Sequence, residues 1–184
     1  MTPAPLLRSL LRTLREGPAA EPAGASAPAE EDVRRMAARL DETARRRLGR
    51  GLALCHVAGG GCGACELEVR MLRGVVYDLE RFGLRFAASP RHADVLVVTG
   101  PPTRNMREAL ERAWTATPEP KWVVAVGDCA LGTGPFQGGY AVHGGAAEVV
   151  PVDLAIPGCP PTPEQVLVGL RVLLEANARG ADAR

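Results

Sequence analysis

The sequence predicts an α/β protein in which helices cover both faces of a parallel or mostly parallel sheet. Two observations lead to this class. Apolar segments of strand length alternate along the chain with segments of helical periodicity, as in successive βαβ units. The strand-like segments, such as residues 95–99, are apolar at consecutive positions. Both of their faces are therefore expected to be buried, as in a parallel sheet.

The predicted elements follow in chain order from residue 30. A helical pattern over residues 30–49 has acidic residues at its start and arginines near its end, as the helix dipole favours. Short apolar runs predict five strands, over residues 52–57, 84–87, 95–99, 122–126 and 149–152. Further helices are predicted from Glu66 onward, over residues 104–116, and over residues 163–176 with a proline at the start.

The chain divides into four segments. Residues 1–16 carry leucines at helical spacing with arginines on the other face, which predicts an amphipathic basic helix. Such a helix docks on a membrane surface or a partner helix, or packs on its own domain. Residues 17–50 form a Pro/Ala/Gly-rich linker and the second helix, and residues 51–177 form the α/β domain. Residues 178–184 form a tail.

Composition excludes several classes of protein. No apolar stretch approaches the ~18 residues that a membrane-spanning helix needs. The formal net charge of +1 gives no basis for nucleic-acid binding. The five cysteines are an odd number, and the N-terminus has no secretory signal, so we expect a cytosolic chain. Clustered thiols in such a chain indicate metal or redox chemistry.

Four of the five cysteines lie in glycine- or proline-rich turns that follow predicted strands. Cys62 and Cys65 form a C-x2-C pair in GGGCGAC, Cys129 follows Gly-Asp, and Cys159 lies in PGCPP. Because the carboxyl ends of parallel strands share one edge of the sheet, these thiols are expected to converge. Four thiolates suit tetrahedral zinc or an iron–sulfur cluster.

The cysteine spacing favours a [4Fe–4S] cluster over the other interpretations. Structural zinc sites commonly use two C-x2-C pairs, whereas this chain has one pair and two single cysteines. Zinc and unligated thiols remain alternatives. Cys55 lies inside a predicted strand and is interpreted as a buried core thiol.

Other candidate residues give weaker signals. His56, His92 and His143 are scattered along the chain and are interpreted as surface or core histidines. The turn GGGCGAC lacks the G-x-G-x-x-G frame of a dinucleotide site and the Lys-Ser/Thr pair of a P-loop. No nucleotide or flavin site is therefore predicted.

Five stretches, in order, carry a family resemblance: GCGACELEV, YDLERFG, ASPRHADVLVVTGPPTRNM, PEPKWVVAVGDCA and VPVDLAIPGCPPTPEQVL. Together they resemble the 20 kDa iron–sulfur subunit family over roughly residues 51–175. That family includes the 20 kDa member of respiratory complex I (NADH:quinone oxidoreductase) and the small subunits of membrane-bound nickel–iron hydrogenases. The resemblance implies a flavodoxin-like fold and one [4Fe–4S] cluster. It carries the ligand roles onto Cys62, Cys65, Cys129 and Cys159.

The resemblance also implies a place in a larger assembly. The expected partners are a large subunit, a ferredoxin-like 4Fe–4S subunit, and membrane-arm subunits that contact residues 4–15. The chain would be peripheral, on the cytoplasmic side of the cell membrane. It would pass electrons between the ferredoxin-like subunit and the active site of the large subunit.

One motif separates two branches of the family. Complex I members typically have two adjacent cysteines at the first ligand position, whereas this chain has C-x2-C and is most similar to the formate hydrogenlyase and hydrogenase-4 type small subunits. Ala87 also stands where complex I members carry an arginine. The quinone-reducing 20 kDa member of complex I is the alternative, and a zinc-stapled scaffold module is an alternative of another class.

Glu68 is the one further candidate that the resemblance supports. The family places an acidic residue three positions after the second ligand, where Glu68 stands. A carboxylate there is a candidate proton-coupling group beside a redox centre. The alternative is an ordinary carboxylate in a helix salt bridge.

Overall fold

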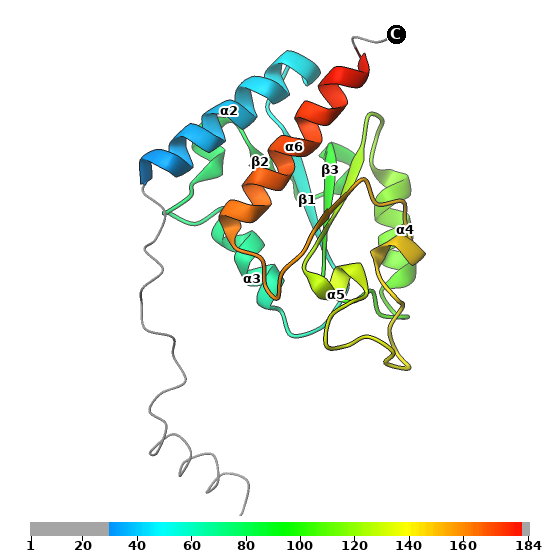
Figure 1. The fold of residues 1–184 in the computed structure, drawn as a ribbon. Helices are drawn as coiled ribbons and strands as arrows, with labels where there is room; N and C mark the ends of the chain where they lie inside the picture. The colour runs from blue at the N-terminus through cyan, green and yellow to red at the C-terminus, as the bar shows by residue number, and fades with distance from the viewer. Residues whose placement is uncertain (1–29, 182–184) are drawn as a thin grey trace, which may run out of the picture.

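The computed structural model describes residues 30–181, which form a sheet between two layers of helices (Figure 1). In chain order its elements are α2 (Glu30–Leu48), β1 (Ala53–Ala58), α3 (Ala64–Met71), η1 (Leu79–Phe82), β2 (Arg85–Phe86), η2 (Pro90–His92), β3 (Val95–Thr99), α4 (Arg107–Ala116), β4 (Trp122–Val126), α5 (Asp128–Leu131), η3 (Ala146–Glu148), β5 (Leu154–Ile156) and α6 (Pro163–Ala181). The predicted helix over residues 1–16 and the linker over residues 17–29 lie outside the described residues.

The sheet has five strands in the order β2-β1-β3-β4-β5. Each neighbouring pair is parallel; in β3, for example, Val97 lies beside His56 of β1 and Val124 of β4. This order is typical of flavodoxin-like doubly wound sheets, in which connections leave β1 and β3 in opposite directions. The predicted α/β class and the flavodoxin-like fold are therefore confirmed.

Two apolar layers bury the two faces of the sheet. Alternate strand residues point to opposite faces, so Leu54 and Val97 pack in one layer while Cys55 and Leu96 pack in the other. Residues of α2, α3 and α6 complete the first layer, and residues of α4, α5 and η3 complete the second. In the first layer α2 packs against both α6 and η1 (Figure 1).

The predicted last strand was wrong. The apolar residues 149–152 are not a strand; β5 is Leu154–Ile156, which pairs with β4. Val150, two residues after η3, is buried in the second layer, so its apolarity reflects packing on a face of the sheet. Asp153 then starts the pairing, since its N–H donates to the Val123 carbonyl at 2.9 Å.

Several element boundaries also differ from the sequence prediction. The predicted helix over residues 104–116 begins only at Arg107, because the preceding residues form a turn in which the Met106 N–H donates to the Thr103 carbonyl. Helix α3 begins at Ala64, two residues before the predicted start at Glu66. Helix α6 continues past residue 176 to Ala181, and the short α5 was not predicted.

Within residues 30–181, none of the helices has the length and apolar character needed to cross a bilayer.

Candidate metal centre

The four predicted ligand cysteines follow the carboxyl ends of three strands, β1, β4 and the edge strand β5. Cys62 lies in the loop after β1, and Cys65 is the second residue of α3. Cys129 is the second residue of α5, directly after β4, and Cys159 lies in the loop after β5. Cys65 and Cys129 are buried, whereas Cys62 and Cys159 are exposed, and all four are free thiols.

The four thiols are close enough to act on one another electrostatically. Burial raises the pKa of the Cys65 thiol to about 11, and the charges of Cys129, Cys159 and Cys62 contribute to this rise in that order. Cys62, Cys65 and Cys129 also line a common pocket with residues of the β1 and β3 loops, among them Thr99 and Pro101. The four cysteines that the sequence singled out thus lie at one edge of the sheet, within electrostatic reach of one another.

Backbone amides point at the buried sulfurs. Burial, followed by the neighbouring Cys159, raises the pKa of the Cys129 thiol, and a hydrogen bond from the backbone N–H of Phe136 opposes this rise. A backbone hydrogen bond from the N–H of Cys65 similarly opposes the rise in pKa at its own thiol. Such donors stabilise negative charge on sulfur.

Glycines clear the space around the same two sulfurs. A Cβ on Gly127 would collide with the Sγ of Cys65, and a Cβ on Gly134 would lie 2.5 Å from the Sγ of Cys129. Gly127 also has φ +90°, which L side chains rarely adopt. The backbone at these two glycines therefore lies closer to the sulfurs than it could if either residue carried a side chain.

A reciprocal pair of hydrogen bonds joins two of the cysteine loops, and sequence reasoning missed it. The Asp128 N–H donates to the Gly158 carbonyl at 2.9 Å, and the Gly158 N–H donates to Asp128 Oδ1 at 2.8 Å. Each partner directly precedes a cysteine, so Cys129 and Cys159 are held side by side. The sequence feature that could have indicated this pair is Asp128, a polar residue just after an apolar strand.

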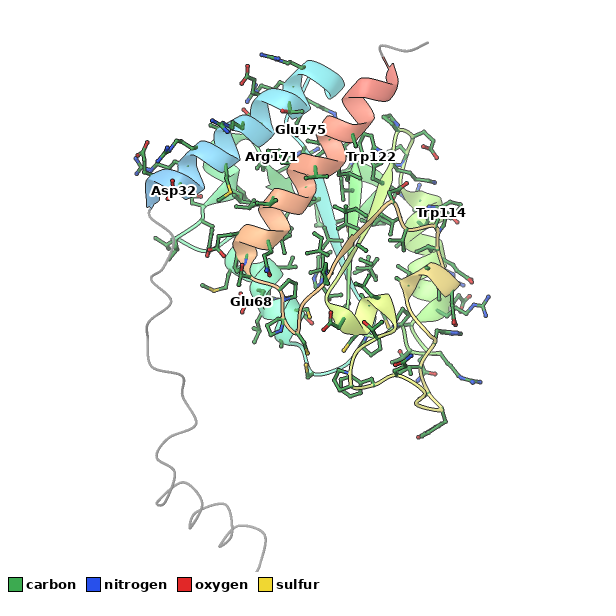
Figure 2. All side chains as sticks on the ribbon, viewed as in Figure 1. Asp32, Glu68, Trp114, Trp122, Arg171 and Glu175 are labelled. Atoms are coloured by element: carbon green, nitrogen blue, oxygen red, sulfur yellow. The ribbon has the colours of Figure 1, made fainter. Side chains whose placement is uncertain are left out.

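Glu68 lies on α3, one turn after Cys65 and near the start of α6 (Figure 2). Its side chain is half-buried, and its charge raises the pKa of the Tyr77 hydroxyl. On the same helix it is Glu66 that forms the ion pair with Arg70, at 2.5 Å.

The fifth cysteine and the histidines lie elsewhere. Cys55 is 6% exposed and packs in the second apolar layer, which confirms its interpretation as a core thiol. His56 Nε2 lies 2.8 Å from Thr99 Oγ1, and burial lowers the pKa of this imidazole. His92 is exposed on η2, and His143 Nδ1 lies 4.0 Å from Glu148. In residues 30–181, no three His, Cys, Asp or Glu side chains, the four candidate ligand cysteines included, are grouped as they would have to be to hold one metal ion. The four thiols therefore share one edge of the sheet without forming a closed coordination site.

The sheet order and the cysteine loops define a class: a flavodoxin-like α/β protein with four thiols at the carboxyl edge of its parallel sheet. A sequence model of the family described as NADH ubiquinone oxidoreductase, 20 Kd subunit, matches residues 62–173. This is more than half of the chain, and the chain belongs to this family. The family contributes subunits to oxidoreductase complexes.

Two curated relatives have hydrogenase names. The chain is 41% identical over 140 residues to formate hydrogenlyase subunit 7 of Escherichia coli strain K12, covering 73% of this chain and 55% of that protein. It is 39% identical over 132 residues to a probable membrane-bound hydrogenase subunit, mbhJ, of Pyrococcus furiosus, covering 72% of this chain and 79% of that one. The chain thus spans about half the length of the formate hydrogenlyase subunit.

A solved structure of a membrane-bound sulfane sulfur reductase, described as an archaeal respiratory membrane complex, contains a similar chain. The two chains are 32% identical, each is covered to 74%, and the TM-score is 0.61. The fold therefore matches that of a chain in a respiratory membrane complex.

Proposed function

We propose that this chain is the electron-transfer subunit of a membrane-associated, complex I-related oxidoreductase and holds one [4Fe–4S] cluster. Cys62, Cys65, Cys129 and Cys159 are the proposed ligands. The observation that carries the proposal is the convergence of these four free thiols from three separate loops at one edge of the sheet.

The surroundings of the thiols fit such a cluster. When bound, it would accept and release single electrons. The chain would supply four thiolates and the Phe136 N–H as a hydrogen-bond donor to sulfur. Gly127 and Gly134 would let the backbone close around the site and keep water from the buried sulfurs. Cys62 and Cys159 lie on the exposed side, toward which a partner chain would bind.

The proposed partners are a large subunit that holds the active site and a ferredoxin-like 4Fe–4S subunit. Exposed apolar residues on α3 and the following turn support partner contacts close to the cysteines. These residues are Leu67, Met71, Val75 and Val76, of which Val75 is 95% exposed. We further propose that residues 4–15 contact membrane-arm subunits and that the chain is peripheral on the cytoplasmic side.

The names of the curated relatives favour a membrane-bound nickel–iron hydrogenase of the formate hydrogenlyase or hydrogenase-4 type. The description of the matching family favours the second candidate, a quinone-reducing complex I in which this chain is the 20 kDa member. The sequence of the large subunit separates them, because two C-x2-C pairs there would supply nickel ligands. Their absence would contradict the hydrogenase assignment.

We also propose Glu68 as a proton-coupling group, because it lies one turn from Cys65 and because Arg70 on the same helix pairs with Glu66. Glu68→Gln is expected to keep the iron content while slowing turnover of the assembled complex about tenfold or more. Glu108→Gln, which changes an exposed carboxylate on the separate helix α4, is the control. Equal rates for the two variants would contradict the assignment.

Metal analysis tests the proposed function directly. The reconstituted chain should contain iron and sulfide near four each and give a cluster EPR signal on reduction. Cys129→Ser should lose most of the iron, whereas Cys55→Ser, which alters only a core thiol, should retain it. One zinc per chain without sulfide would overturn the proposal in favour of the zinc-stapled module.

A further inference from the structure

A hydrogen bond between two distant segments lies next to the cysteine site. Tyr77 follows α3 in the chain and is only 7% exposed, with its ring packed in the first apolar layer. Its hydroxyl donates to Oε1 of Glu164, in the first turn of α6 and 87 residues away in sequence. The bond thus joins the turn after α3 to the first turn of α6, and α3 and α6 also contact each other directly.

Each end of this hydrogen bond is connected to a ligand cysteine. On one side, Tyr77 packs in the same apolar layer as Val69 and Leu72, which follow Cys65 along α3 and its end. On the other side, Glu164 lies five residues after Cys159. The bond therefore links the turn that follows the helix of one buried thiol to the helix that follows the loop of an exposed one.

The segment between Cys159 and Glu164 is stiff, so a movement of Glu164 is passed on to Cys159. Two consecutive prolines follow Cys159 and fix their own φ angles. Thr162 then caps α6 reciprocally: its N–H donates to Gln165 Oε1 at 2.8 Å, and its Oγ1 accepts from the Gln165 N–H at 3.4 Å. A shift of the first turn of α6 would therefore move Cys159.

The bond joins a neutral hydroxyl to a charged carboxylate, and the Tyr77 hydroxyl keeps its proton at neutral pH. Burial raises the pKa of Tyr77, and the hydrogen bond to Glu164 and the charges of Glu164 and Glu68 raise it further. Burial disfavours the charged form of Glu164, but hydrogen bonds from Tyr77 and Thr162 lower its pKa overall. A phenol donor and an ionised acceptor are thus the stable forms, in the class of the stronger hydrogen bonds.

We propose that Tyr77 is a positioning residue for the cysteine site: its hydroxyl holds the first turn of α6, and with it Cys159, in place relative to Cys65. On its other side, Cys159 is held through the Asp128–Gly158 pair. The inference rests on the proposed cluster function, because the separation of these two thiolates matters most when both bind the same group. The spacing of the ligands would then set how firmly the cluster is held and at what potential.

Tyr77→Phe tests this inference because it removes the hydroxyl and keeps the ring in the core. The variant should retain iron and sulfide near four each. It should release iron to a chelator about tenfold faster than the wild type and show a shifted midpoint potential, because a hydrogen bond to a charged group is lost. Tyr140→Phe is the matched control, since Tyr140 is 92% exposed on the loop after α5.

Two variants of the acceptor test the same bond from its other end. Glu164→Gln keeps an oxygen acceptor but removes its charge, so its effects should lie between those of the wild type and of Tyr77→Phe. Glu164→Ala should reproduce Tyr77→Phe, and the double variant should be no worse than either single one, because both remove the same interaction. Additive effects in the double variant would contradict the inference.

A second readout needs no metal. In the metal-free full chain, Tyr77→Phe should accelerate amide hydrogen exchange over residues 159–166, whereas Tyr140→Phe should not. If the wild type binds no cluster, the proposed function fails, yet faster exchange would still support the positioning role. Equal exchange rates, iron release and potentials in the two tyrosine variants would overturn it.

Discussion

At the residue scale, Gly127 shows how closely the backbone approaches the thiols. Its φ is +90°, and an added Cβ would collide with Cys65 Sγ. Gly138 has a similar φ of +75° with no atom within 4 Å of an added Cβ. Both positions have a positive φ, and only Gly127 adds crowding at the site.

Gly138→Ala should lower the free energy of unfolding by about 1 kcal/mol through strain alone. Gly127→Ala should lose that amount plus about 1–3 kcal/mol, because Cys65 must move to make room. Urea unfolding of both variants in the same metal state measures the difference. Equal losses would show that the neighbouring thiol accommodates a methyl group freely.

His56 should make stability depend on pH in the mildly acidic range. Burial lowers the pKa of its imidazole below the ordinary value of 6.5, with smaller effects of Glu66 and Arg70 that oppose each other. As pH falls through 6.5, the unfolded chain takes up the proton first, so the wild type loses stability until the folded pKa is reached. The loss is at most about 1.4 kcal/mol per pH unit.

The comparison with His56→Asn isolates this effect, because asparagine does not titrate. The difference in unfolding free energy between wild type and variant should be constant well above the ordinary histidine pKa. As the pH falls below that value, the wild type should lose stability relative to the variant. A difference that stays constant across the mildly acidic range would contradict the assigned pKa direction.

At the element scale, Asp94 aligns the starts of β1 and β3. It is 2% exposed and accepts hydrogen bonds from the Ala53 N–H at 2.9 Å and from both terminal nitrogens of Arg50. Its own N–H donates to the Ala53 carbonyl at 2.8 Å. The carboxylate therefore fixes the register of β3 against β1, the strand whose far end leads to the Cys62 loop.

Asp94→Ala should lower the free energy of unfolding by about 2–3 kcal/mol, because it leaves the buried Ala53 N–H without its acceptor. The matched control is Glu108→Ala, which removes an exposed helix ion pair with Arg112 and should change stability by about 0.5 kcal/mol or less. Thermal or urea unfolding checks both. Similar losses in the two variants would show that the strand register does not depend on Asp94.

The element scale also shows where sequence reasoning succeeded and failed. Residues 95–99 and 122–126 were predicted correctly because both faces of a central strand are apolar. The last strand was predicted at the wrong residues for two reasons. Val150 is apolar because it packs on a face of the sheet, and the edge strand β5 has few buried residues. Helix α5 was missed because a single turn has no measurable periodicity.

At the scale of the whole molecule, the amphipathic residues 1–16 and the described α/β domain make separate predictions. Deleting residues 1–16 should release the chain from membranes into the soluble fraction while leaving its iron content unchanged, because no ligand cysteine lies in that segment. Fractionation followed by metal analysis measures both quantities. Unchanged membrane association after the deletion would refute docking by this segment.

The sequence by itself determined the α/β class, the four thiols and their positions after strands, because periodicity, turn residues and cysteine spacing are local properties. Only the tertiary structure decided the contacts around those thiols. The Asp128–Gly158 pair and the Tyr77–Glu164 bond join residues 30 and 87 positions apart. No local pattern encodes such pairings, because they exist only once the parallel sheet brings the ends of separate strands to one edge.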